Sequence, residues 1–216
     1  MTARNDECGG TLHRVLFIGN SYTARHDLPA LIAHQIGNMR AQMVVAGGAS
    51  LRRHWNSGRA SSAIESDAWT HVVLQEQSTL PIKNRARFHE NVRLFDRAIR
   101  DVGAKPVLYL TWARASAPES QSVLNAAVRE IAAELGATIA PVGVAWACAR
   151  SRYPDIALHL ADGSHPTGAG AFLSACVFSA TLAGPDRALL TRPPSLQVGD
   201  RCARALADIA LETVEG

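Results

Sequence analysis

The chain has 216 residues, of which 47% are hydrophobic and 19% are charged, and its formal net charge is +3. This length is sufficient for one domain with a full hydrophobic core, and the composition excludes a largely disordered chain. Because the net charge is small and the Lys and Arg residues are dispersed, nucleic acid is not an expected partner. We expect a single folded domain over residues 14–216, preceded by a loose tail over residues 1–13.

The sequence shows no signal for export or membrane insertion. Residues 1–10 lack the apolar core of a secretory signal, and no apolar run approaches the ~18 residues of a membrane-spanning helix. The default expectation is a cytoplasmic protein without a membrane partner. The cysteines form no C-x-x-C pair and have no spacing suited to zinc, so we expect no metal site, three reduced structural thiols and one thiol on the tail. They are Cys8, Cys148, Cys176 and Cys202.

The first predicted element is a buried strand over residues 15–18, where the four apolar residues V-L-F-I follow one another. Gly19 and Asn20 stop this run at once, as expected for a strand that is covered on both faces and ends in a sharp turn. Ser21 lies at the apex of that turn. The turn therefore presents a hydroxyl group at the end of a strand.

Strand and helix patterns alternate along the rest of the chain. Apolar residues at helical spacing, with capping residues, proline or glycine at the ends, predict helices, and short apolar runs predict strands. The segments 51–68 and 76–81 are irregular, and we expect loop and short helix in the first and a loop in the second. Helices are expected over residues 27–36, 85–102, 119–135, 146–151, 168–182 and 200–214, and further strands over residues 42–46, 70–75, 106–110 and 137–140.

Five strands that alternate with helices predict a parallel sheet with helices on both faces and right-handed crossovers. The expected fold is a three-layer α/β/α domain of the flavodoxin-like type, with a five-stranded sheet. Such sheets bind ligands beyond the carboxyl ends of their strands. The segments that carry Ser21, Gly48, Gln77 and Arg114 all follow predicted strands, so we expect them to gather at one edge of the sheet.

A second group of chemically active residues lies near the other end of the chain, where residues 162–166 read D-G-S-H-P. A serine hydroxyl is a weak nucleophile at neutral pH, so it needs a base, and the base needs a partner that fixes its tautomer. His165 and Asp162 suit these two supporting roles. Asp162 can orient His165 and bond the loop amides at the same time.

Both segments resemble those of the SGNH or GDSL-like hydrolase superfamily. Residues 19–23, G-N-S-Y-T, resemble its first block, G-D-S-x-T, and residues 162–165, D-G-S-H, resemble its last block, D-x-x-H. The two blocks occur in the family's order, and the resemblance covers roughly residues 14–184. It implies that Ser21 is the nucleophile and that Gly48 corresponds to the glycine of the second block, whose backbone N–H points at the oxyanion. The backbone N–H of Ser21 is the other expected backbone donor to the oxyanion.

The third block departs from the family pattern Gly-x-Asn-Asp, in which the asparagine side chain donates to the oxyanion. Residues 74–78 read L-Q-E-Q-S and contain no asparagine. Glutamine carries the same amide donor on a longer stem, so Gln77 is expected to replace it. Gln75 is the alternative, although it still lies within the apolar strand pattern. This stretch and T-W-A-R at residues 111–114 resemble a bacterial subgroup of the superfamily.

Three further residues are candidates for contact with the substrate. Trp112 and Arg114 come just after a predicted strand, and Trp with Arg suits a sugar face or an anionic group. Trp55, in the irregular segment, is the third candidate. For Trp146, core packing is an equal alternative.

The sequence therefore predicts a serine esterase that hydrolyses carboxylic esters, with short acyl groups such as acetyl on a carbohydrate or a similar polar alcohol as first choice. No metal or organic cofactor is expected, since Ser21, His165 and Asp162 supply the chemistry. A lipid or thioester hydrolase and an acyltransferase are the enzymatic alternatives. A carbohydrate-binding domain whose catalysis has decayed is the non-enzymatic one.

Overall fold

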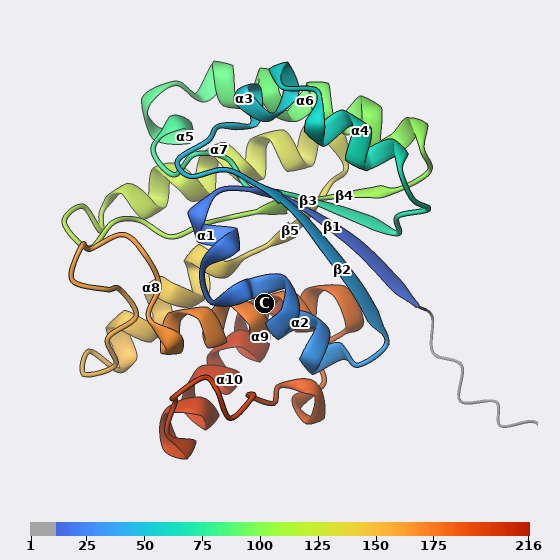
Figure 1. Ribbon diagram of the computed structural model, residues 1–216. Helices are drawn as coiled ribbons and strands as arrows, with labels where there is room; N and C mark the ends of the chain where they lie inside the picture. The colour runs from blue at the N-terminus through green and yellow to red at the C-terminus, as the bar shows by residue number, and fades with distance from the viewer. Residues whose placement is uncertain (1–11) are drawn as a thin grey trace, which may run out of the picture.

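Five parallel strands form one sheet in the computed structural model, which describes residues 12–216 (Figure 1). The strands lie in the order β2-β1-β3-β4-β5, which is the flavodoxin-like order, so the predicted fold class is confirmed. Of the predicted tail, residues 1–11, including Cys8, lie outside the described residues, and His13 already belongs to the sheet. The strands are β1 (His13–Gly19), β2 (Met39–Val45), β3 (His71–Leu74), β4 (Lys105–Tyr109) and β5 (Thr138–Ala140).

Strands β1 and β2 show how position in the sheet controls the sequence signal. β1 lies between two other strands, and its residues 15–18 are completely buried, as their unbroken apolar run predicted. β2 lies at the sheet edge and begins at Met39, earlier than the predicted start at Gln42. Since an edge strand is partly exposed, it tolerates polar residues such as Arg40 and shows no continuous apolar run.

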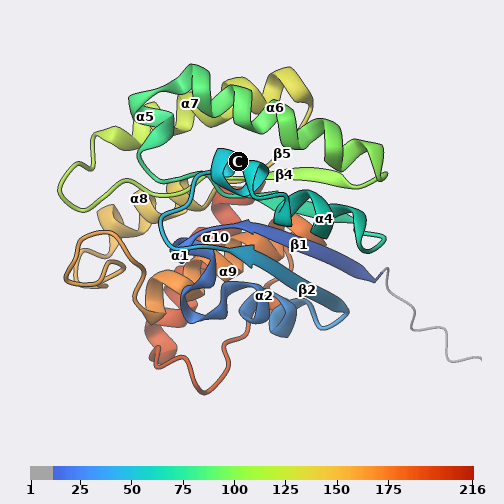
Figure 2. The ribbon, with the colours of Figure 1, turned by 45° about the horizontal axis from the view of Figure 1, so that its top comes forward.

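Helices cover both faces of the sheet, so the sheet and the two helical layers make up the three predicted layers (Figures 1 and 2). Side chains of β1 alternate between two hydrophobic cores, with Phe17 in one and Leu16 and Ile18 in the other. The first core contains α2 (Leu28–Ile36), α8 (Val142–Arg152), α9 (Gly168–Ala183) and α10 (Asp200–Glu215). The second contains α3 (Leu51–Asn56), α4 (Arg59–Glu65), α6 (Arg85–Asp101) and α7 (Ser120–Leu135).

The last two helices form successive layers on the first face. α9 is buried over most of its surface, as its apolar sequence predicted, because α2, α8 and α10 pack around it. α10 buries only one side, which includes Leu206 and Ile209, and forms the predicted surface layer. None of the helices described between residues 12 and 216 is long and apolar enough to cross a membrane.

The segment 51–68 is more regular than expected, since it forms the two helices α3 and α4. The Ser50 side chain begins α3 by accepting a hydrogen bond from the Arg53 N–H, and Gly58, at φ +71°, separates the two helices. Leu51 and Ile64 are completely buried, so tertiary packing stabilises helices that are too short to be stable alone. The remaining short elements are α1 (Ser21–Ala24), α5 (Leu80–Lys83), which lies partly in the predicted loop 76–81, and 3-10 turns at Arg25–Asp27 and Arg187–Leu189.

Candidate active site

Ser21 follows β1 closely and begins the short helix α1. The turn before it is held by Asn20, whose side-chain oxygen accepts a hydrogen bond from the Tyr22 N–H and whose amide donates to the Ala49 carbonyl, both at 3.1 Å. The Asn20 backbone N–H donates to the Gln75 side-chain oxygen at 2.8 Å. The turn that carries Ser21 is thus tied to the loop after β2 and to the end of β3.

Ser21, His165 and Asp162 form one hydrogen-bonded chain. The His165 Nε2 atom lies 2.9 Å from the Ser21 Oγ atom, and the His165 Nδ1 atom lies 2.6 Å from the Asp162 Oδ2 atom. Since a carboxylate only accepts, Nδ1 carries a hydrogen, and the neutral imidazole leaves its Nε2 lone pair for the serine hydroxyl. Two segments 144 residues apart in the sequence therefore supply a hydroxyl, a base and a carboxylate.

The second carboxylate oxygen of Asp162 holds the loop that carries His165. Oδ1 accepts hydrogen bonds from the backbone N–H groups of His165 and Ser164, both at 2.9 Å. Three hydrogen bonds hold the pKa of Asp162 well below its usual range. In order of decreasing effect, they come from the His165 backbone N–H, from the His165 ring and from the Ser164 N–H. Asp162 is therefore ionised at neutral pH, and it orients the imidazole while it fixes the loop.

A stack of three aromatic rings, Tyr22, Trp112 and Trp146, supports this loop. The Tyr22 hydroxyl lies 2.7 Å from the Ser164 hydroxyl, and the Trp112 Nε1–H donates to the Ser164 carbonyl at 2.9 Å. The ring centroids of Tyr22 and Trp112 are 4.6 Å apart, and those of Trp112 and Trp146 are 3.7 Å apart. Both faces of Trp112 are covered by the neighbouring rings, so a sugar cannot stack on this ring, and the predicted contact with a substrate is left to the ring edge.

The other two predicted substrate contacts have different surroundings. The Trp55 ring packs edge-to-face against Phe95 of α6, with 5.2 Å between the centroids, in the second hydrophobic core. The structure therefore gives Trp55 a packing role, because the short helix α3 turns this side chain towards α6. Arg114 is exposed in the loop after β4 and stays a candidate for substrate contact.

The predicted backbone donors of the oxyanion hole lie in the turn after β1 and the loop after β2. Within residues 12–216, neither the Ser21 N–H nor the Gly48 N–H donates to a protein acceptor. Gly48 has φ +61°, a backbone conformation that favours glycine, and it is exposed. The bond from Asn20 to the neighbouring Ala49 carbonyl holds this loop against the turn that carries Ser21. Both N–H groups are thus free to bind an oxyanion.

The two candidate glutamines have different environments. Gln75 is completely buried, where its side-chain oxygen accepts from Asn20 N–H and from the Thr23 hydroxyl, and its amide donates to the Glu76 carbonyl at 2.6 Å. The Gln77 side-chain oxygen accepts two hydrogen bonds from Thr79, both at 3.0 Å. In the described part of the chain, the Gln77 side-chain amide donates to no other group. Gln75 therefore braces the turn, and Gln77 has an amide available for a ligand.

Replacing Gln77 by Ala is expected to lower kcat about 100- to 1000-fold with KM nearly unchanged, because an oxyanion donor acts in the transition state. Gln75→Ala is expected to act mainly on stability, since it leaves the buried Asn20 N–H without an acceptor, at a cost of about 1–3 kcal/mol. Steady-state kinetics and urea unfolding of both variants measure the two effects. The opposite ranking would transfer the oxyanion role to Gln75, and near-wild-type turnover in both would leave that role to backbone N–H groups.

Glu76 is a buried residue that the sequence analysis did not single out. Its Oε1 atom accepts from the Leu51 N–H at 3.0 Å and from the Gln77 N–H at 2.7 Å, and its Oε2 atom accepts from the Asn91 side chain at 2.9 Å. Burial raises the pKa of this carboxyl group, although these hydrogen bonds oppose the shift. One carboxylate therefore connects the start of α3, the loop after β3 and α6. A glutamate in a short polar loop usually points to solvent. The only feature of the sequence that could have indicated a buried Glu76 is its position directly after a predicted buried strand.

Glu76→Gln is expected to destabilise the protein by about 1–3 kcal/mol, because an amide nitrogen cannot accept the hydrogen bonds of the carboxylate oxygen it replaces. The urea midpoint should fall with the unfolding slope unchanged. Glu65→Gln, at an exposed position at the end of α4, is the matched control and should leave the midpoint unchanged. Equal midpoints for the two variants would contradict the bracing role of Glu76.

No protein-family model matches the chain, and no curated protein matches its sequence. Solved structures do match it. A protein from Slackia heliotrinireducens that is assigned to the SGNH hydrolases has 28% identity and a TM-score of 0.69, over 79% of this chain and 98% of that one. A DUF4886 family protein from Bacteroides uniformis ATCC 8492 has 18% identity and a TM-score of 0.74, over 94% and 95% of the two chains. The acetyl xylan esterase AlAXEase has 14% identity and a TM-score of 0.66, over 78% and 99%.

The last two similarities concern the fold, whereas the Slackia protein also shares more than a quarter of the aligned residues. The fold carries the two sequence blocks at the expected places, with Ser21 at the end of β1 and His165 just before α9. The order of the five parallel strands agrees with the same assignment. The strand order, the two sequence blocks and the similarity to the Slackia protein therefore support the predicted resemblance to the SGNH or GDSL-like hydrolase superfamily.

Proposed function

We propose that the protein is a serine hydrolase of carboxylic esters. The observation that carries this proposal is the hydrogen-bonded chain from Ser21 Oγ through His165 to Asp162, with distances of 2.9 and 2.6 Å. This arrangement is the one that activates a serine hydroxyl for acyl transfer. A carbohydrate-binding domain that had lost its catalytic activity would not require this arrangement.

In the proposed reaction, His165 Nε2 takes the proton of Ser21 as Oγ attacks the acyl carbon. The negative charge on the carbonyl oxygen is stabilised by the N–H groups of Ser21 and Gly48 and by the Gln77 amide. The carbon–oxygen bond to the alcohol then breaks, and His165 gives its proton to the leaving oxygen. In the second half, His165 deprotonates a water that attacks the acyl-Ser21 ester, and the acid leaves as Ser21 regains its proton.

The proposed substrate carries a short acyl group, such as acetyl, on a carbohydrate or a similar polar alcohol. Arg114 is exposed next to Ala115, whose N–H donates to the Gly163 carbonyl in the loop that carries His165, and its charge suits a polar alcohol better than a lipid chain. An acetyl xylan esterase is among the structures with the same fold, which supports this choice as a class. The chemistry requires no metal or organic cofactor, because the chain supplies nucleophile, base and oxyanion donors.

Hydrolysis of p-nitrophenyl acetate, butyrate and octanoate tests the activity and the acyl preference in one series. We expect kcat/KM to be highest for acetate and to fall with chain length. A rise towards octanoate would favour a lipid hydrolase, and acyl transfer to added sugars in place of water would identify a transferase. Absence of turnover on all three esters and on acetylated sugars would contradict the proposal.

A further inference from the structure

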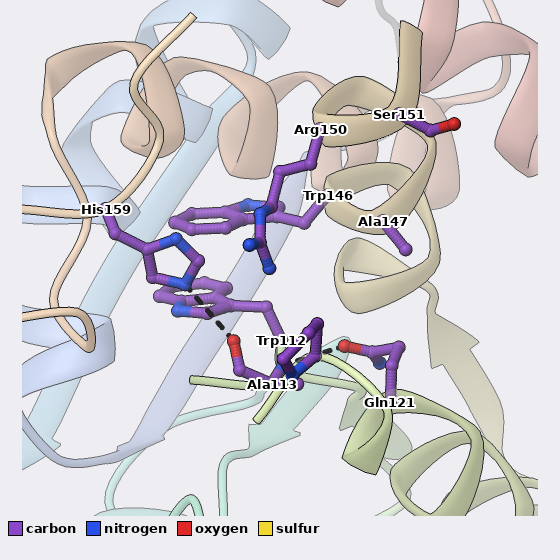
Figure 3. Close-up of a pocket in the computed structure, with 9 residues that line it drawn as sticks. Trp112, Ala113, Gln121, Trp146, Ala147, Arg150, Ser151 and His159 are labelled. Carbon is purple, nitrogen blue, oxygen red and sulfur yellow. Dashed lines mark hydrogen bonds between the residues drawn. The ribbon is translucent and has the colours of Figure 1, made fainter. Parts of the chain in front are cut away.

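A cavity of about 260 Å³ lies beside the loop that carries His165, and neither Ser21, His165 nor Asp162 lines it. Its walls come from the loop after β4, from the start of α7, from α8 and from the segment before the loop that carries His165 (Figure 3). The lining side chains include Trp112, Trp146, Arg150, Ser151 and His159. This volume lies just below the range of about 300–1,000 Å³ that is usual for ligand pockets, so the cavity suits a ligand no larger than about one sugar ring.

The cavity wall is directly connected to the catalytic loop. His159 pairs with Pro166, the residue after His165, in an antiparallel bridge. Trp112 donates its Nε1–H to the Ser164 carbonyl. A ligand in the cavity would therefore contact the residues that support the catalytic loop, next to the proposed reaction.

Arg150 supplies an unpaired positive charge to the cavity. It lies in the last turn of α8, and its side chain extends towards the two tryptophan rings and His159 (Figure 3). Within residues 12–216 it has no ion pair and no hydrogen bond from its side chain, whereas Arg152 on the same helix pairs with Glu212 at 2.6 Å. A half-buried guanidinium without an acceptor favours an anionic ligand, above all a carboxylate that accepts two parallel hydrogen bonds.

His159 supplies an acceptor in the same cavity. Its Nε2 atom lies 3.1 Å from the Ala113 carbonyl oxygen, which only accepts, so Nε2 carries the hydrogen. Burial first, and then the charge of Arg150, lower the pKa of His159, so the ring is neutral at neutral pH. The Nδ1 lone pair is then free to accept from a hydroxyl group, and the Ser151 hydroxyl can donate or accept.

We propose that this cavity binds a hydroxylated carboxylate of about the size of one sugar acid, with Arg150 pairing with the carboxylate and His159 accepting from a hydroxyl group. Such a ligand has two sources, which share this chemistry. It is either the alcohol part of the ester substrate, in which case the inference rests on the proposed esterase function, or a free hydroxy acid that binds beside the catalytic loop.

Matched esters test the first source. Methyl glucoside and methyl glucuronide, acetylated at the same hydroxyl, differ only at C6, which is a hydroxymethyl group in the first and a carboxylate in the second. We expect the wild type to prefer the glucuronide ester, and the ratio of the two kcat/KM values to fall about 10- to 100-fold in Arg150→Met, which loses a charge-assisted bond but keeps its apolar stem. Arg152→Met removes an exposed, paired cation of the same helix and should keep the wild-type ratio.

Calorimetric titration with free D-glucuronate tests the second source and needs no turnover. Wild type and Arg152→Met should bind glucuronate more tightly than D-glucose, and Arg150→Met should lose the difference. The NMR signal of the His159 ring should shift with glucuronate, because a bound anion offsets the charge of Arg150. Binding without an ester preference would assign the site to a free acid. Equal kcat/KM values for the two esters, together with no binding of glucuronate, would overturn the proposal. If the protein hydrolysed neither ester, the titration alone would still test the site.

Discussion

Ser21→Ala is expected to lower kcat for p-nitrophenyl acetate by about six orders of magnitude, because no other hydroxyl in the catalytic chain can form the acyl intermediate. The wild type should also react with a fluorophosphonate probe, and mass spectrometry of tryptic peptides should locate the adduct on Ser21. The structure gives the reason, since the half-buried Ser21 hydroxyl lies at the start of α1, 2.9 Å from the His165 Nε2 atom.

Ser66→Ala provides the matched control for this experiment. Ser66 is exposed at the end of α4, and its hydroxyl donates to the Ala63 carbonyl. The variant should react with the probe and turn over substrate as the wild type does. Probe labelling that persists undiminished in Ser21→Ala would exclude Ser21 as the nucleophile.

His165→Ala is expected to lower kcat by about six orders of magnitude, and Asp162→Asn by about four, because the carboxylate acts through the imidazole. Asparagine can keep the oxygen that accepts from the His165 and Ser164 N–H groups, so the loop should retain its structure. The substitution should therefore change mainly which ring nitrogen of His165 carries the hydrogen. Kinetics with p-nitrophenyl acetate and thermal unfolding separate a catalytic loss from a structural one.

His34→Ala is the control for the histidine change, since His34 is exposed on α2. It should keep wild-type activity and stability. An active His165→Ala variant would remove His165 from the mechanism. If His165→Ala failed to fold while Asp162→Asn folded normally, the imidazole would be needed for the structure of the loop. The loss of activity in Asp162→Asn would then be the measure of the catalytic role.

The sequence by itself determined the alternation of strands and helices and the two segments that form the hydrogen-bonded chain of Ser21, His165 and Asp162. Buried parallel strands need continuous apolar runs and their crossover helices need apolar stripes, so residues 15–18 and α6 are visible as local patterns. Ser21, Asp162 and His165 lie in short motifs, and their residue types are those of a nucleophile, an orienting carboxylate and a base. Both kinds of signal depend only on residues that are close together in the sequence, so they can be recognised without the structure.

The tertiary structure alone decided what the remaining polar and aromatic residues do. Trp112 and Trp55 have the same residue type, yet Trp112 lies between Tyr22 and Trp146, whereas Trp55 packs on Phe95. Gln75 and Gln77 differ in the hydrogen-bond partners that Asn20 and Thr79 bring to them. Burial and hydrogen-bond partners come from segments far away in the sequence, so no local pattern records them. The buried environment of Glu76, for example, exists only because α3 and α6 pack around it.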